Sequence, residues 1–172
     1  RLKTDKMPVG MGVGVNTDNV VTGNIGSSKR MDFTMIGDGV NLAARLEGSC
    51  KTYGAQIIIS EFTQTKLKGI YALRELDRIV VKGKTEPVSI FEVLDFHDDE
   101  TFPARMDVVG HFTEGLAHYR NTKFDDAIRS FKAALDANSE DVPSKLYIER
   151  CDLFKKSPPP KDWSGEWVMT EK

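Results

Sequence analysis

The first part of the chain alternates apolar residues with glycine and polar residues, which is the two-residue period of β-strands. In "MPVGMGVGVNTDNVVTGNIG", residues 7–26, two valine-containing runs flank the polar segment "NTDN". This pattern predicts a β-hairpin with its turn at residues 16–19. Glycines weaken a strand and mark places where another backbone or a ligand comes close. A further strand is predicted for "MDFTMIG", residues 31–37.

From residue 38 the apolar positions follow a helical period. Residues such as Leu42 and Leu46 recur on one side, and Asp38 is of the residue type that caps helix N-termini. The sequence therefore predicts a helix that begins at Asp38 and is capped by this aspartate.

Strands and helices continue to alternate up to about Phe96. "QIIIS", residues 56–60, is a short apolar run that indicates a buried strand, and "EFTQTKL", residues 61–67, indicates a short helix. Residues 71–96 predict two strands around the turn "KGKTEP".

Beyond an acidic segment at residues 98–109, which we interpret as a linker, the period is helical. The spacing of aromatic and small residues in residues 110–137 resembles a tetratricopeptide helix pair, and a third helix ends before the three prolines at 158–160. One such repeat cannot bury its own apolar face. We therefore expect it to pack on another surface, with Trp163 and Trp167 as anchors.

Composition narrows the class of protein. The 172 residues carry a net charge of -2, and 40% are hydrophobic and 29% charged, as in one or two small soluble domains. The charge balance does not favour nucleic acid, and no apolar run reaches the ~20 residues of a membrane span. Cys50 and Cys151 fit no metal spacing, which indicates reduced thiols and a cytoplasmic location. We assign none of the three histidines to a metal.

Asn41 and Arg45 are the candidate functional pair. At positions i and i+4 they project from the same side of the predicted helix. Both lie in its first two turns, where the helix dipole favours an anion and disfavours a cation. A bound phosphate would explain this placement, with the amide holding a hydroxyl and the guanidinium neutralising charge. Surface helices also carry solvated Asn and Arg, so the spacing alone leaves both interpretations open.

The full string "DFTMIGDGVNLAARLE" resembles the signature of class III nucleotidyl cyclases, in particular the cyanobacterial and related bacterial adenylate cyclases. "GVGVNTDNVVTGNIGSSKRMDFT" before it and "LDRIVVKGKTEPVSIFEV" after it match the same family in order and spacing, so the resemblance covers about residues 8–94. It implies an α+β fold, the ferredoxin-like cyclase catalytic fold, incomplete at its N-terminal side, in residues 1–97. A small all-α tetratricopeptide-like tail is expected in residues 110–172.

The resemblance also implies an activity: an adenylate cyclase catalytic region that converts ATP to 3′,5′-cyclic AMP and pyrophosphate. In the family, the composite site lies between the two subunits of a head-to-tail homodimer. Matched residue by residue, Asn41 and Arg45 correspond to the transition-state pair, and Thr34 to the residue that reads the purine. Lys82 corresponds to the triphosphate lysine, with Lys84 as an alternative.

Two metal ions, Mg²⁺ or Mn²⁺, are implied as cofactors. The family's two metal-binding aspartates and its base-recognising lysine lie in segments expected before Arg1, so we assign no metal ligand among the residues present. We expect the chain to supply one side of the site, to be inactive alone, and to act as a homodimer or with a complete cyclase chain. A phosphate-contacting arginine of some members is replaced by Gly-Met-Gly at residues 10–12.

Three alternatives stay open at this stage. Because the Thr34 hydroxyl both donates and accepts, it is compatible with adenine without excluding a guanylate cyclase. The chain could also be a non-catalytic, cyclase-like regulatory subunit, or an interaction protein that acts through its helical tail.

Overall fold

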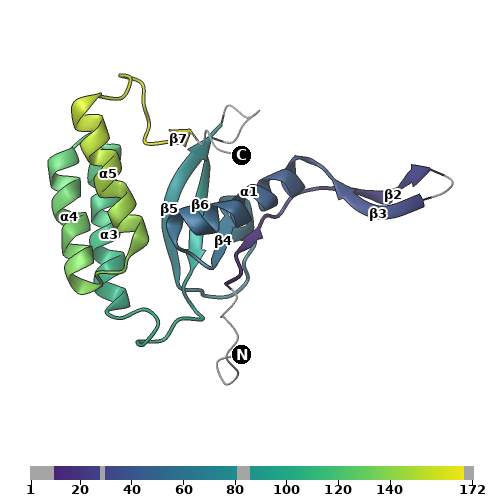
Figure 1. Cartoon of the computed structure of the whole chain (residues 1–172), viewed down its shortest axis with the longest axis horizontal. Coiled ribbons are helices and arrows are strands. Elements are labelled where there is room, and N and C mark those ends of the chain that lie inside the picture. The colour runs from purple at the N-terminus through teal and green to yellow at the C-terminus, as the bar shows by residue number, and fades with distance from the viewer. Residues whose placement is uncertain (1–9, 28–29, 81–85, 169–172) are drawn as a thin grey trace.

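The computed structural model describes residues 10–27, 30–80 and 86–168. These residues form a mixed five-stranded sheet, a two-stranded hairpin that projects from the body, and three helices on the side away from the hairpin (Figure 1). This combination of helices with a mixed sheet and an antiparallel hairpin confirms the predicted α+β class.

The five-stranded sheet has the order β1-β4-β6-β5-β7. Its strands are β1 (Val13–Val15), β4 (Ile57–Ser60), β5 (Leu73–Val80), β6 (Val88–Val93) and β7 (Trp167–Val168). β6 is antiparallel to both β4 and β5, whereas β1 runs parallel to β4 and β7 parallel to β5. The strands predicted within residues 56–60 and 71–96 are confirmed.

Helix α1 (Asp38–Tyr53) packs its apolar side on this sheet, and the short helix α2 (Glu61–Gln64) follows β4. The shared core consists of Leu42, Leu46, Cys50, Tyr53, Ala55, Ile58, Leu76, Ile79, Val88 and Ile90. Gly14 permits the close approach of β1 to α1, because a Cβ atom there would lie 2.3 Å from the carbonyl oxygen of Ala43. The glycine-rich stretch thus marks a close backbone contact, as predicted.

The hairpin predicted around residues 16–19 is wrong. β2 (Val21–Ser27) pairs antiparallel with β3 (Arg30–Ile36), and β1 pairs with β4 instead. The register of β2 and β3 is continuous from one end of the strands to the other. β1, in contrast, joins the sheet beneath α1. Pairing with β4 and packing on α1 therefore outweigh a local turn at residues 16–19.

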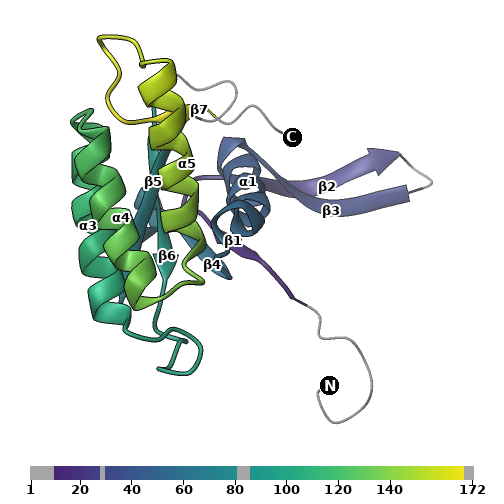
Figure 2. The same ribbon diagram turned by 60° about the vertical axis from the view of Figure 1, so that its left-hand side comes forward.

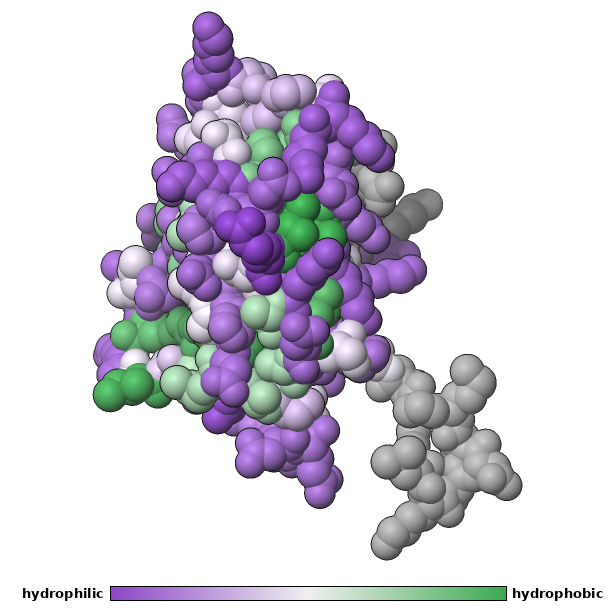
Figure 3. Space-filling model, turned by 90° about the vertical axis from the view of Figure 1, so that its left-hand side faces the viewer, coloured by the Kyte–Doolittle hydropathy of each residue, from purple (hydrophilic) through white to green (hydrophobic). Residues whose placement is uncertain are grey.

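Helices α3 (Arg105–Arg120), α4 (Phe124–Ala137) and α5 (Val142–Lys156) form a helical layer along β5 (Figures 1 and 2). Its outward face is largely hydrophilic (Figure 3). α3 begins inside the segment predicted as a linker, because Phe102 and Val108 are buried with Leu94 in one apolar cluster. None of the described helices is both long and apolar enough to cross a lipid bilayer.

Buried ion pairs join the helical layer to the sheet. Arg74 contacts Glu92 at 2.5 Å and Asp141 at 2.6 Å, and all three side chains are at most 4% exposed. Arg150 contacts Asp77 at 2.5 Å, again with both side chains at most 4% exposed. The sheet therefore covers the inner side of the helical layer, as expected for a single repeat that cannot bury its own face.

The terminal tryptophans also contact this layer. Trp163 packs against the rings of Tyr119 and Phe154, and the Trp167 ring lies 4.1 Å from the guanidinium carbon of Arg150. Trp167 also pairs with Ile79 of β5 and so joins the layer to the sheet as expected, whereas Trp163 packs within the layer. The tetratricopeptide-like character of the helix pair stays a prediction.

Candidate functional site

Helix α1 places Asn41 and Arg45 one turn apart on its solvent-facing side. The residues that follow them, Leu42 and Leu46, are 2% and 0% exposed and belong to the sheet core. The helical period consequently turns Asn41 and Arg45 outward, and both are exposed. The structure thus brings the predicted pair together at an accessible surface.

The N-terminus of α1 lacks the predicted aspartate cap. Gly37 occupies the capping position, and no described side chain makes a capping hydrogen bond there. Gly37 has φ 151° and ψ 163°, a conformation open essentially to glycine only. Its carbonyl oxygen accepts hydrogen bonds from the N–H groups of Val40 and Asn41. Asp38 is instead the first helical residue, where its negative charge interacts favourably with the helix dipole.

Thr34 lies on β3, and the hairpin that carries it leads into α1 through Gly37. It is half-buried and pairs with Gly23 of β2. A Cβ atom at Gly23 would meet nothing within 4 Å, so the hairpin leaves room beside Thr34. Because side chains alternate along a strand, Phe33 and Met35 face the opposite side.

Lys82 and Lys84 lie outside the described residues. The strands before and after them are described, and Ile79 of β5 pairs with Val88 of β6. Their proposed contact with a triphosphate therefore rests on the sequence match.

The loop formed by residues 16–19 is a partner of α1 that sequence reasoning missed. Asn16 Nδ2 donates a hydrogen bond to the Gly39 carbonyl oxygen at 3.1 Å, and Asn16 Oδ1 accepts one from Ser60 Oγ at 2.6 Å. A Cβ atom at Gly39 would lie 2.4 Å from the Cβ atom of Asp18, so the loop lies against the first turn of α1. The available signal was a run of hydrogen-bonding side chains, which we interpreted only as a turn.

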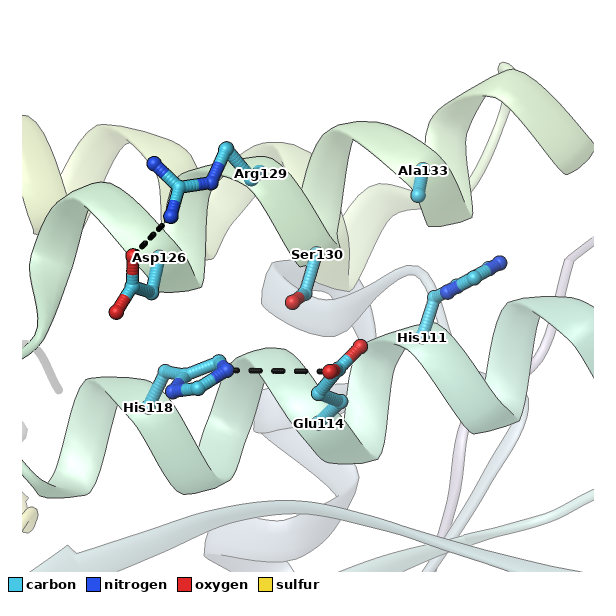
Figure 4. Close-up of a pocket in the computed structure, with 7 residues that line it drawn as sticks. All are labelled: His111, Glu114, His118, Asp126, Arg129, Ser130 and Ala133. Carbon is cyan, nitrogen blue, oxygen red and sulfur yellow. Dashed lines mark hydrogen bonds and ion pairs between the residues drawn. The ribbon is translucent and has the colours of Figure 1, made fainter.

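A cavity of about 430 Å³ opens between α3 and α4, and no residue of α1 lines it (Figure 4). It is lined by His111, Glu114, His118, Asp126, Arg129, Ser130 and Ala133. Two pairs of its side chains contact one another, Glu114 with His118 and Asp126 with Arg129. Among the residues that the structure describes, no three His, Cys, Asp or Glu side chains are placed to hold a metal ion. Neither this cavity nor α1 fits the implied metal pair.

Comparison with known proteins identifies relatives. Residues 2–94 match the family described as Adenylate and Guanylate cyclase catalytic domain. The terminal-differentiation-specific adenylate cyclase of Dictyostelium discoideum is 34% identical over 143 residues, which are 81% of this chain and 7% of that protein. The adenylate cyclase of Anabaena cylindrica is 43% identical over 94 residues, which are 53% of this chain and 19% of that protein.

A similar solved structure is the adenylyl cyclase CyaB from P. aeruginosa, with a TM-score of 0.47 and 35% identity over 57% of this chain and 49% of that chain. The chain spans only a small part of the Dictyostelium and Anabaena relatives. The Dictyostelium match covers more of the chain than residues 2–94 do, so it includes part of the helical layer. Because the family match takes in the hairpin, α1, β5 and β6, and more than half of the residues, the chain belongs to the adenylate and guanylate cyclase catalytic domain family.

Proposed function

We propose that this chain forms one side of a composite adenylate cyclase site that converts ATP to 3′,5′-cyclic AMP and pyrophosphate. The observation that carries the proposal is the exposed pair Asn41 and Arg45 at the N-terminal end of α1, next to the hairpin that bears Thr34. The named relatives in Dictyostelium and Anabaena are adenylate cyclases, which supports ATP as the substrate.

In this proposal the two α1 side chains have separate tasks. The Asn41 amide orients the ribose, so that its 3′-hydroxyl oxygen attacks the α-phosphorus, releases its proton to solvent, and the bond to the pyrophosphate oxygen breaks. The Arg45 guanidinium stabilises the negative charge that develops on the α-phosphate oxygens. The positive end of the α1 dipole adds to this stabilisation, because the phosphate would lie near the free N–H groups of the first turn. A cation that is unfavourable in the isolated helix becomes favourable beside the anionic ligand.

Thr34 and Lys82 complete this side of the proposed site. The Thr34 hydroxyl would accept a hydrogen bond from the exocyclic amino group of adenine, in the space that Gly23 leaves open. Lys82 would neutralise charge on the triphosphate.

The other side of the site would come from a second subunit in a head-to-tail homodimer, or from a complete cyclase chain. The Mg²⁺ or Mn²⁺ pair implied by the family does not fit the described residues of this chain. This division of labour is why we expect the chain alone not to form cyclic AMP.

The kinetic test uses an active cyclase assembly that contains this chain. Asn41→Ala or Arg45→Ala should each lower kcat by on the order of 100-fold, with a smaller change in KM, because they remove interactions made mainly in the transition state. Arg129→Ala is the control, since Arg129 is exposed on α4 and away from α1. A change confined to KM would contradict the assigned roles.

The same preparations show which nucleotide is the substrate. Faster turnover of ATP than of GTP supports an adenylate cyclase, and the reverse preference identifies a guanylate cyclase instead. Cyclic AMP formation by the isolated chain, free of other cyclases, would contradict the proposal that it holds only one side of the site.

A further inference from the structure

The first turn of α1 is held by a neighbouring loop and not by a cap of its own. No described side chain caps this helix, and Gly37 at the capping position has no side chain to offer. The loop of residues 16–19 lies directly against the turn, where Gly39 is buried and a Cβ atom would overlap Asp18. Because Asn41 follows Gly39 by only two residues, the contacts that hold this turn also determine the position of Asn41.

Asn16 makes the direct bond to this turn. Its Nδ2 atom donates to the Gly39 carbonyl oxygen at 3.1 Å, and its Oδ1 atom accepts from Ser60 Oγ at 2.6 Å. A carbonyl oxygen can only accept, so the amide nitrogen must face Gly39 and the amide oxygen is left for the hydroxyl. Both ends of the Asn16 amide are thereby used, and the orientation of the group is determined by its partners.

The second partner ties the turn to the central sheet. Ser60 ends β4 and caps α2, where its Oγ accepts from the Thr63 N–H group at 3.2 Å. Thr63 Oγ1 lies 3.1 Å from Thr17 Oγ1 and donates to the Val15 carbonyl oxygen at 3.3 Å. The loop is therefore bonded to β4 and α2, α2 is bonded to β1, and Asn16 also bonds to α1.

We propose that Asn16 is a positioning residue for the cyclase reaction, which fixes the first turn of α1 and through it the directions of Asn41 and Arg45. This inference rests on the proposed function, because it concerns the same site. A displacement of a reacting group by about 1 Å can cost a factor of about 100 in rate. The Asn16 side-chain bond to this turn, which no described side chain caps, is therefore a sensitive point of the site.

The first test needs no activity. Hydrogen exchange of the α1 amides at residues 40–45 is measured on this chain as wild type, Asn16→Ala and Asn16→Asp. The aspartate keeps the size and the acceptor for Ser60 but loses the donor to Gly39, so both variants should exchange about fivefold faster there. Asn19→Ala is the matched control, because the Asn19 side chain makes no hydrogen bond within the described residues. Exchange in Asn16→Asp equal to that of the wild type would overturn the inference.

The second test measures kinetics in the active assembly that contains this chain. Asn16→Ala and Asn16→Asp should lower kcat about 10-fold or more and leave KM within about threefold, whereas Asn19→Ala should change neither. Faster exchange with an unchanged kcat would show that the turn is fixed but not needed for the reaction, and would overturn the positioning role. If Asn41→Ala also leaves kcat unchanged, the proposed function itself fails, and exchange alone then decides whether Asn16 fixes the turn.

Discussion

Tyr119 and Tyr147 touch in the core of the helical layer, with ring centroids 4.9 Å apart and both side chains fully buried. The Tyr147 hydroxyl donates to the Leu76 carbonyl oxygen of β5 at 2.9 Å. The Tyr119 hydroxyl, in contrast, is buried without a hydrogen-bond partner in the described part of the chain. Burial raises the pKa of Tyr119, so the hydroxyl stays protonated and its lost hydration is uncompensated.

Removing the hydroxyl group of each tyrosine should therefore affect the free energy of unfolding differently. Tyr119→Phe should leave the free energy of unfolding unchanged or raise it by up to about 1 kcal/mol, because it removes an unsatisfied polar group. Tyr147→Phe should lower it by about 1 to 2 kcal/mol, because the Leu76 carbonyl loses this donor. Urea unfolding of both variants measures the difference, and a greater loss in Tyr119→Phe would contradict the structure.

At the scale of elements, β5 is the strand that holds the helical layer. Four consecutive positions take part: Arg74 with Asp141, Glu75 with Arg120, the Leu76 carbonyl with Tyr147, and Asp77 with Arg150. A bulge between Glu75 and Asp77 interrupts the alternation, so Leu76 and Asp77 are both buried. Burial alone would lower the pKa of Arg150, but the Asp77 carboxylate together with the neighbouring Tyr53 and Tyr147 outweighs burial and raises the pKa. The guanidinium therefore stays charged in the interface.

Removal of the Arg150 charge from its buried pair with Asp77 is expected to lower the stability of the fold strongly. Arg150→Met should lower the free energy of unfolding by about 3 to 5 kcal/mol, because it leaves the Asp77 carboxylate buried without a counter-charge, with only the neutral Tyr53 hydroxyl and Arg78 N–H as donors among the described residues. Adding Asp77→Asn should recover part of this loss, since a neutral amide needs no counter-charge.

Chemical unfolding of the single and double variants measures the coupling. Arg129→Met is the control: its pair with Asp126 is mostly solvent-exposed, so the change should stay within about 0.5 kcal/mol. A similar loss in Arg129→Met, or no recovery in the double variant, would contradict the role of the buried pair.

At the scale of the whole molecule, the hairpin of β2 and β3 extends away from the body (Figure 1). Met31, Phe33 and Met35 share one side of β3 and are 62%, 71% and 56% exposed. In a monomer these contiguous apolar side chains stay in contact with water and contribute no burial free energy. Such a patch on a projecting element indicates a surface that another chain covers. The proposed homodimer would bury them.

Phe33→Asp is therefore expected to weaken self-association at least about 10-fold, because a charge would have to be buried at the interface. Sedimentation over a range of protein concentrations measures the dissociation constant. Leu153→Asp is the matched control, since Leu153 is a half-exposed leucine on α5, away from the hairpin. Equal self-association of Phe33→Asp and the wild type would contradict the role of the hairpin.

The sequence by itself determined most elements and the spacing of the candidate site. The 3.6-residue period was enough to place Asn41 and Arg45 on one exposed side of α1, because buried Leu42 and Leu46 leave no other orientation. The strands β4 and β6 followed from short runs rich in β-branched residues, and β5 followed from its place before the turn "KGKTEP". These features depend on neighbours within a few positions, which the sequence shows directly.

Only the tertiary structure decided which elements meet. β1 joined β4 and not β2, and the loop of residues 16–19 became a support for α1 instead of a hairpin turn. Asp38 lost the capping role because Gly37 takes a backbone conformation that leaves the turn to Asn16. The sheet covered the helical layer through charges such as Arg74 and Asp77, residue types that a sequence pattern assigns to the surface. Strand pairing and burial of this kind depend on interactions between residues far apart in the chain. A local sequence pattern does not show these interactions.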